Sequence, residues 1–509
     1  MRGPHNIWRL IRTGATFERS GAMRLALEAM DAPPALRILA RILGKPFAWL
    51  GYRGDPSLPP VSRALTALGP AYIKFGQIMS TRPDVVGVAL ADELKKLQDD
   101  LPPFDMATAR KTIERELGQP ADTLFSQIDP PLAAASLAQV HRAVERGTGR
   151  TVAIKVLRPG IERAFFRDVD AFYFAARMVD IFSPAARRLR PMDVIEHFES
   201  VAVGELDLRM EAAAAAEFRS NTRDDPGFTV PEVIWHLSAK RVMTLEWAEG
   251  RKFSDIPSLV AAGADPIDLS ERVLQMFLKV ALRDGFFHGD MHQGNLKLAP
   301  NGDIVALDFG IMGRIDAYTR RVYAEVLIGF LRQDYRRIAE VHFEAGYVPA
   351  DRDIEAFAQA LRAIGEPIFG QDARSISIAR LLAHLFDVTE RFGMETRTEL
   401  ILLQRTMVVV EGVSRSLNND MNFWEASKPV VERYIRDNLG PRAVARDLSK
   451  TVAILARFGP LLPVMAENAL IAANKPAGRR RVEDRKIPWW AWMLTGAGLA
   501  GAVLLIAAA

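Results

Sequence analysis

The 509-residue sequence contains no cysteine, which excludes disulfide bonds and metal sites built on thiolates. We do not expect a secretory signal, because the basic stretch 1–21 has no apolar core of signal-peptide length. The formal net charge of +4 is small for this length and gives no indication of nucleic-acid binding. With 49% hydrophobic and 25% charged residues, a folded chain of two or more domains is expected.

Charged residues are absent from 487–509, a stretch that opens with three tryptophans. About 20 apolar residues are enough to cross a bilayer, and tryptophan suits the headgroup interface. The basic residues immediately before it are Arg479, Arg480, Arg481, Arg485 and Lys486. By the positive-inside rule we expect a single C-terminal span in the cytoplasmic (inner) membrane, with the bulk of the chain on the cytoplasmic side. The alternative is a buried C-terminal helix, since the glycines of this stretch weaken its hydrophobicity.

Helical periodicity dominates the rest of the chain and predicts an α+β, mainly α, fold. One pair of strands is predicted at 140–143 and 151–156, and a second pair at 231–234 and 241–245. A short strand–loop–strand is predicted at 294–308. A small strand-containing lobe is thus followed by a helical lobe.

The chain is predicted to have five parts, four of them before the membrane span. They are an N-terminal helical extension (1–120), a small strand-containing lobe with a helical insert (121–250), a helical lobe (251–430), a helical tail with a basic linker (431–486) and the transmembrane helix (487–509).

A lysine stands on one of the predicted strands, in the sequence Val-Ala-Ile-Lys that ends at Lys155. A lysine on a half-buried strand can reach the phosphates of a nucleotide, as in kinases. The alternative is a lysine whose side chain simply extends to the surface.

A more specific pattern follows at 288–295, which reads His-Gly-Asp-Met-His-Gln-Gly-Asn, and at 307–310, which reads Leu-Asp-Phe-Gly. An Asp followed five positions later by an Asn fits a kinase catalytic loop, and Asp-Phe-Gly fits the metal-binding turn. Asn295 and Asp308 supply the hard oxygen ligands that Mg²⁺ prefers. Asp290 can orient or deprotonate an attacking hydroxyl or water.

The histidines of this segment suggest another reading, a zinc or iron site on His288, Asp290 and His292. That alternative would leave the strand lysine and the Asp-Phe-Gly turn unexplained.

The stretch 131–142 stands where a kinase has its glycine-rich phosphate loop, yet it contains no glycine. Glycine lets a backbone approach phosphates closely and take positive φ, which alanine resists. A nucleotide could still bind, with a different loop geometry.

These motifs together resemble the UbiB family, atypical kinase-like proteins of ubiquinone biosynthesis related to the mitochondrial ADCK group. The family's Lys-x-Gly-Gln motif stands at 74–77, and its Glu-x-Asp motif at 205–207, with Glu211 beyond it. The resemblance runs from about residue 60 to 320 and implies an atypical protein-kinase-like fold. The alanine-rich loop of the family corresponds to Ala133, Ala134, Ala135 and Ser136.

The resemblance implies that the alanine-rich loop and Lys155 contact ATP. Lys155 would pair with a helix carboxylate, with Glu211 favoured and Glu205 as the alternative. Asn295 and Asp308 would ligate Mg²⁺, with Asp290 at the catalytic position.

In the family the N-terminal extension folds over the active site and limits the access of protein substrates. Lys74 and Gln77 would lie on it, with Glu205 and Asp207 as partners of Lys74. At this spacing, Glu205, Asp207 and Glu211 would not all lie on one face of a helix. Two different lysine partners would suit that divergence. The alternative for these acids is a solvated helix face.

Two departures from the family pattern matter. The usual prolines of the catalytic loop are replaced by Met291 and Gln293, which leaves the stiffness of the loop open. After Gly310 the chain reads as helix, with no Ala-Pro-Glu and no segment that could dock a peptide. This favours ATP hydrolysis or a small or lipid-embedded substrate.

The function predicted first is that of a membrane-anchored ATPase supporting ubiquinone biosynthesis. It would present polyprenyl-phenol or quinone intermediates to the other enzymes of the pathway and respond to anionic lipid. The alternatives are a true protein or small-lipid kinase and a nucleotide-binding scaffold without catalysis. Nothing supports the older family label of 2-polyprenylphenol 6-hydroxylase, since no dinucleotide fingerprint or two-His-one-carboxylate set is present. The small-residue spacing of Gly496 and Ala500 leaves a homodimer open.

Overall fold

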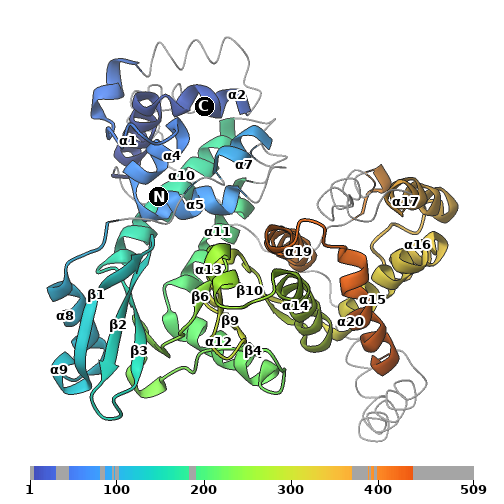
Figure 1. Ribbon diagram of the computed structural model, residues 1–509. Coiled ribbons are helices and arrows are strands. Elements are labelled where there is room, and N and C mark those ends of the chain that lie inside the picture. Colours follow the sequence, from blue (N-terminus) through green and yellow to red (C-terminus); the bar gives the residue numbers. More distant parts are fainter. Residues whose placement is uncertain are drawn as a thin grey trace, which may run out of the picture. The chain divides into compact units, whose positions relative to one another are not determined.

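The computed structural model describes residues 5–29, 45–80, 86, 88–94, 97, 102–182, 191–369, 388, 391–394 and 398–438 (Figure 1). The chain divides into two compact units. Unit 1 comprises Met1–Ala212, Val233–Trp247 and Glu483–Ala509, and unit 2 comprises Ala213–Glu232 and Ala248–Val482. Helix α12 (Leu208–Thr222) begins in unit 1 and ends in unit 2. The five-part division expected from the sequence stays a prediction.

Unit 1 contains an antiparallel sheet with the strand order β1-β2-β3-β5. Its strands are β1 (Phe125–Ala134), β2 (Ala138–Glu145), β3 (Thr151–Leu157) and β5 (Val242–Glu246). The predicted strands at 140–143, 151–156 and 241–245 are therefore confirmed. The strand predicted at 231–234 is wrong, because that segment makes only an isolated bridge from Val233 to Leu245 before the 3-10 turn η3 (Trp235–Leu237).

Strand β1 was not predicted from the sequence, because it contains Pro130 and Pro131. Proline cannot donate to a strand ladder and is confined to edges and irregular positions. β1 satisfies both conditions: it is the edge strand of the sheet, and its register shifts between Ile128 and Pro131.

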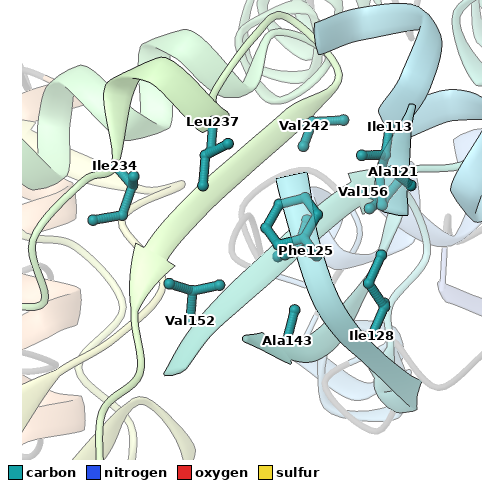
Figure 2. Packing of buried hydrophobic residues seen from close by; sticks show 11 residues of the cluster. Ile113, Ala121, Phe125, Ile128, Ala143, Val152, Val156, Ile234, Leu237 and Val242 are labelled. Atoms are coloured by element: carbon teal, nitrogen blue, oxygen red, sulfur yellow. The ribbon is translucent and has the colours of Figure 1, made fainter. Parts of the chain in front are cut away.

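The core of unit 1 lies on one face of this sheet. Val152, Ile154 and Val156 alternate along β3 and are all fully buried. They pack with Ile113 of α8 (Met106–Leu117) and with Phe125, and Figure 2 shows this cluster. Because side chains alternate along a strand, Lys155 points to the opposite face.

Among the described helices of unit 1, α5 (Pro70–Met79) packs against four others. Those four are α4 (Pro60–Leu68), α7 (Val88–Leu94), α10 (Ile161–Phe182) and α11 (Pro191–Glu205). The other short elements of the unit are α1 (His5–Ser20), α2 (Ala22–Ala29), η1 (Lys45–Leu50) and α9 (Ala121–Leu124).

Unit 2 is mainly helical, with two small sheets of strand order β4-β9-β8-β6 and β10-β7. The predicted strand–loop–strand at 294–308 is confirmed as the antiparallel pair β8 and β9. The strands are β4 (Phe228–Thr229), β6 (Arg251–Lys252), β7 (Phe286–His288), β8 (Leu296–Leu298), β9 (Ile304–Ala306) and β10 (Met312–Arg314). The helices are α13 (Ile256–Ala261), α14 (Pro266–Lys279), η4 (Val280–Asp284), η5 (Gln293–Asn295), α15 (Ala317–Arg332), α16 (Tyr335–Glu344), α17 (Ile354–Phe369), α19 (Thr398–Leu417) and α20 (Phe423–Asn438).

Within the ranges given above, no helix has the length and apolar character needed to cross a membrane. The span predicted at 487–509 lies outside the described residues, as does the predicted tail beyond Asn438.

A glycine determines how closely α5 packs. A Cβ atom on Gly76 would lie 2.5 Å from Leu97 Cδ1 and 2.6 Å from Leu65 Cδ1. Both distances are shorter than van der Waals contact, so a side chain here would have to displace the buried side chains of Leu65 and Leu97.

We therefore expect Gly76→Ala to lower the melting temperature of the protein, because overpacking a buried contact costs about 1–3 kcal/mol. Gly14→Ala on α1 is the matched control, since a Cβ there meets nothing within 4 Å. The control should leave the melting temperature unchanged or raise it slightly, because alanine favours helix. Equal melting temperatures for the two variants, measured by circular dichroism, would contradict this account.

Candidate functional site

The strand lysine of unit 1 forms a two-pronged ion pair with helix α12. Lys155 stands on β3, between β2 and β5, and its Nζ donates to Glu211 Oε1 at 2.7 Å and Oε2 at 2.9 Å. The Glu211 side chain is 7% exposed and that of Lys155 is 21% exposed. The Glu211 carboxylate is thus almost fully buried, and the Lys155 side chain is partly exposed.

The second lysine, Lys74 of α5, pairs with Glu205 at the end of α11. Its Nζ lies 2.6 Å from Glu205 Oε1, and both side chains are largely buried. Asp207, which the sequence also offered as a partner, forms its salt bridge with Arg209 at 2.6 Å. Glu205 and Glu211 lie on different helices, α11 and α12, so the two acids serve two different lysines.

The other residues of the Lys-x-Gly-Gln motif also have defined places. The ring of Phe75 packs against Phe172 of α10 and Phe198 of α11, with centroids 5.1 and 5.3 Å away. Gly76 permits the close helix packing described above. Gln77 is half-buried, and its carbonyl accepts a hydrogen bond from the Ser80 hydroxyl at 2.6 Å.

The alanine-rich segment forms a tight turn. Ala133 and Ala134 end strand β1, and the Ala135 N–H donates to the Ala138 carbonyl at 2.7 Å. Ser136 in the turn is buried. No residue of the turn adopts positive φ, as expected where alanine replaces glycine.

One arginine that the sequence reasoning missed holds this turn. Arg158 donates from Nε and Nη2 to the Ala135 carbonyl at 3.1 and 3.0 Å. Its backbone N–H donates to the Leu137 carbonyl at 2.8 Å. Burial lowers the pKa of the Arg158 guanidinium. No motif marks this position, so only the folded chain reveals it.

In unit 2 the proposed catalytic residues lie at the ends of paired strands. Asp290 follows β7, Asn295 precedes β8, and Asp308 follows β9. The Leu307 N–H donates to the backbone carbonyl of Asn295 at 2.9 Å. Asp308 follows Leu307 in the chain and is therefore held close to Asn295. The Asn295 side-chain amide donates to the Asp290 carbonyl at 3.0 Å. Three residues predicted from spacing are thus brought together.

The Asp-Phe-Gly turn has an unusual backbone. Asp308 has φ of 60°, in the left-handed region that residues other than glycine rarely adopt. Phe309 is buried, with its ring 5.8 Å from Phe218 of α12 and 5.5 Å from His288. A buried neighbour therefore holds Asp308 in a conformation that would be unfavourable in isolation.

His288 has a structural role rather than a metal-binding one. Its Nε2 donates to the Leu307 carbonyl at 3.0 Å, and its Nδ1 accepts from the Asp290 N–H at 3.0 Å. Burial lowers the pKa of His288, which keeps the ring neutral. Both ring nitrogens are therefore engaged by backbone, and across the part of the chain that is described no group of three His, Asp or Glu residues could hold a metal. The zinc or iron alternative does not fit this geometry.

Helix α19 holds the catalytic loop in place of the missing prolines. The Thr406 hydroxyl donates to the Gly289 carbonyl at 3.1 Å, and the Gln293 side-chain amide donates to the Ser416 hydroxyl. Met291 is fully buried. The two residues that replace proline thus anchor the loop by burial and by hydrogen bonding.

Two protein-family domains match this chain. The ABC1 atypical kinase-like domain matches residues 96–342, and the UbiB helical domain matches residues 361–422. A "Probable protein kinase UbiB" of Azotobacter vinelandii is 36% identical over 504 residues, which are 98% of this chain and 93% of that protein. The chain belongs to the UbiB family. A protein of the same name from Aliivibrio fischeri strain MJ11 is 40% identical over 455 residues, covering 88% of this chain and 84% of its own.

A solved structure supports the fold. The complex of Rv3197 with erythromycin from Mycobacterium tuberculosis has a TM-score of 0.51 and 24% sequence identity, and covers 71% of this chain and 92% of its own. This UbiB protein therefore has a kinase-like ABC1 fold, mainly helical with small sheets, as the sequence predicted. Helix α19, which holds the loop at 288–295, lies within the UbiB helical domain.

We expect the hydrogen bond from Gln293 to Ser416 of α19 to stiffen the loop at 288–295. We expect Gln293→Ala to slow ATP turnover several-fold, since a lost hydrogen bond costs about 1 kcal/mol. Gln293→Pro should recover part of that loss, because proline restricts φ where the family pattern has it. Turnover by phosphate release, with melting temperatures as a check on folding, measures both. A proline variant slower than the alanine variant would show that the hydrogen bond, not loop stiffness, matters.

Proposed function

We propose that this protein binds ATP with Mg²⁺ and hydrolyses the ATP in support of ubiquinone biosynthesis. The observation that carries the proposal is the pairing of Lys155 with Glu211, together with the grouping of Asp290, Asn295 and Asp308 around one pair of strands. Both sets match the residues that kinases use, and membership of the UbiB family supports their use on one nucleotide.

In this proposal Lys155 contacts the phosphates of ATP. Glu211 holds the lysine at a single position, from which its ammonium would contact the phosphate oxygens. The turn of Ala135 and Ser136, held by Arg158, would lie against the nucleotide as a rigid wall.

The donor set of unit 2 fits magnesium. Asn295 and Asp308 would hold the ion, as one or two oxygen side chains together with phosphates usually do. Bound there, Mg²⁺ would neutralise charge on the phosphates. Asp290 would orient the attacking water and accept its proton.

The chain after Gly310 supports hydrolysis, or a small or lipid substrate, over a protein substrate. Residues 311–316 contain only β10 before α15 begins at Ala317, so the described chain has no segment here that could dock a peptide. We propose polyprenyl-phenol or quinone intermediates as the molecules acted on or presented to other enzymes of the pathway. We also propose that residues 487–509 span the membrane once, with the catalytic part of the protein on the cytoplasmic side.

The second candidate is a true kinase, which the name of the relatives, "Probable protein kinase UbiB", favours. A kinase and an ATPase differ in one measurement. A kinase would transfer labelled γ-phosphate to a partner protein or lipid, whereas an ATPase would release it only as free phosphate.

We predict that Asp308→Asn and Asp290→Asn each lower phosphate release from Mg-ATP by roughly 10²-fold or more, since each removes a charge that acts in the transition state. Asp303→Asn is the matched control, because Asp303 precedes β9 of the same strand pair and contacts only Asn301 through its side chain. The control should retain full turnover.

Undiminished turnover in Asp308→Asn would overturn the proposal. An Asp290→Asn variant that still supports a quinone-deficient strain would instead indicate a scaffold. Anionic bilayers should raise turnover of the unaltered protein.

A further inference from the structure

Four large aromatic side chains are exposed together near the N-terminus of the described chain. Trp8 is 48% exposed, Phe47 48%, Trp49 72% and Tyr52 44%. They lie on α1 and on the turn that contains η1, two segments in contact with each other. Figure 1 draws α1 in dark blue. We call these four residues the aromatic face.

The exposure of these rings is built into the packing. A Cβ atom on Gly51 would lie 2.4 Å from the backbone of Ala15, so the turn lies directly on α1. The Tyr52 N–H donates to the Thr16 hydroxyl at 3.0 Å, and Arg19 donates to the Gly51 carbonyl at 2.6 Å. The backbone beneath the rings is therefore held in place while the rings face outward.

Cations accompany the rings. The Arg12 guanidinium stacks on Trp8 and Tyr52, with ring centroids 5.7 and 5.2 Å away, and donates to the Tyr52 hydroxyl at 3.1 Å. Lys45 and Arg53 flank the turn and are exposed. The face thus combines aromatic rings with positive charge, and the large hydrophobic side chains exposed on these two segments are all aromatic.

We propose that the aromatic face docks onto the headgroup layer of an anionic bilayer. Tryptophan and tyrosine are enriched at this level because their rings are apolar with one polar edge, and arginine and lysine bind lipid phosphates. The core of a protein–protein interface also favours aromatic rings and arginine, but it is depleted of lysine, which here flanks the turn as Lys45. The inference rests on the membrane setting of the proposed function but concerns a surface outside the nucleotide-binding residues.

The absence of native cysteine allows a direct test on the full-length protein. Phe47→Cys, labelled with an environment-sensitive fluorophore, is reconstituted into phosphatidylcholine bilayers with or without phosphatidylglycerol. Nitroxide quenchers on the lipid headgroups report contact. Tyr318→Cys on α15, a position 51% exposed, is the control label.

We expect headgroup quenching at position 47 that exceeds the control and increases with phosphatidylglycerol. Salt should weaken it, since at about 1 M the Debye length is only roughly 3 Å. Quenching no greater than at position 318 would overturn the inference. Energy transfer between labelled copies without lipid quenching would also overturn it, because a second copy of the chain would then cover the face.

Substitutions in the labelled protein test how much one ring of the aromatic face contributes to docking. Trp49→Ser should lower the docking equilibrium constant about tenfold, which is a modest share of the free energy of burying an aromatic ring. Trp235→Ser, at a position 53% exposed elsewhere in unit 1, should not. Both variants should keep the melting temperature and the phosphate release of the parent in detergent. Equal docking by the two variants would contradict the inference.

The two proposals fail separately. Lipid contact at position 47 with undiminished turnover in Asp308→Asn would refute the proposed Mg-ATP site and keep the docking face.

Discussion

The ion pair between Lys155 and Glu211 is the interaction on which the candidate site of unit 1 depends. Glu211 is almost fully buried, and a buried carboxylate without a partner is strongly destabilising. The pair therefore joins β3 to the start of α12. Later in the same helix, Phe218 packs on Phe309 of the Asp-Phe-Gly turn. Helix α12 thus contacts the strand lysine at its start, in unit 1, and the Asp-Phe-Gly turn farther along, in unit 2.

The Lys-x-Gly-Gln motif works through packing as much as through charge. Lys74 pairs with Glu205 of α11, Phe75 packs against two aromatic rings, and Gly76 lets α5 approach its neighbours. Three successive residues thereby face three different surroundings, so a substitution at each would disturb a different contact. The motif holds the N-terminal helices of unit 1 to the helix that precedes α12.

The catalytic loop shows how one constraint can replace another. Where the family pattern has two prolines, this chain buries Met291 and ties Gln293 to Ser416 of α19. Thr406 of the same helix holds the Gly289 carbonyl. Tertiary contacts thus hold this loop to the helical domain that follows it, where proline would act by restricting φ.

Local patterns in the sequence were enough to predict β2, β3, β5 and the β8–β9 pair, and spacing alone identified Asp290, Asn295 and Asp308. Strand alternation and fixed motif spacing are properties of neighbouring residues, so they can be read without the fold. The edge strand β1 escaped because its prolines are tolerated only at a sheet edge, which topology decides.

The choice of Glu211 for Lys155 and Glu205 for Lys74, the clamp of Arg158 on the alanine-rich turn and the support from α19 were settled only by tertiary structure. Each joins residues far apart in the chain, and their meeting depends on how whole helices and strands pack.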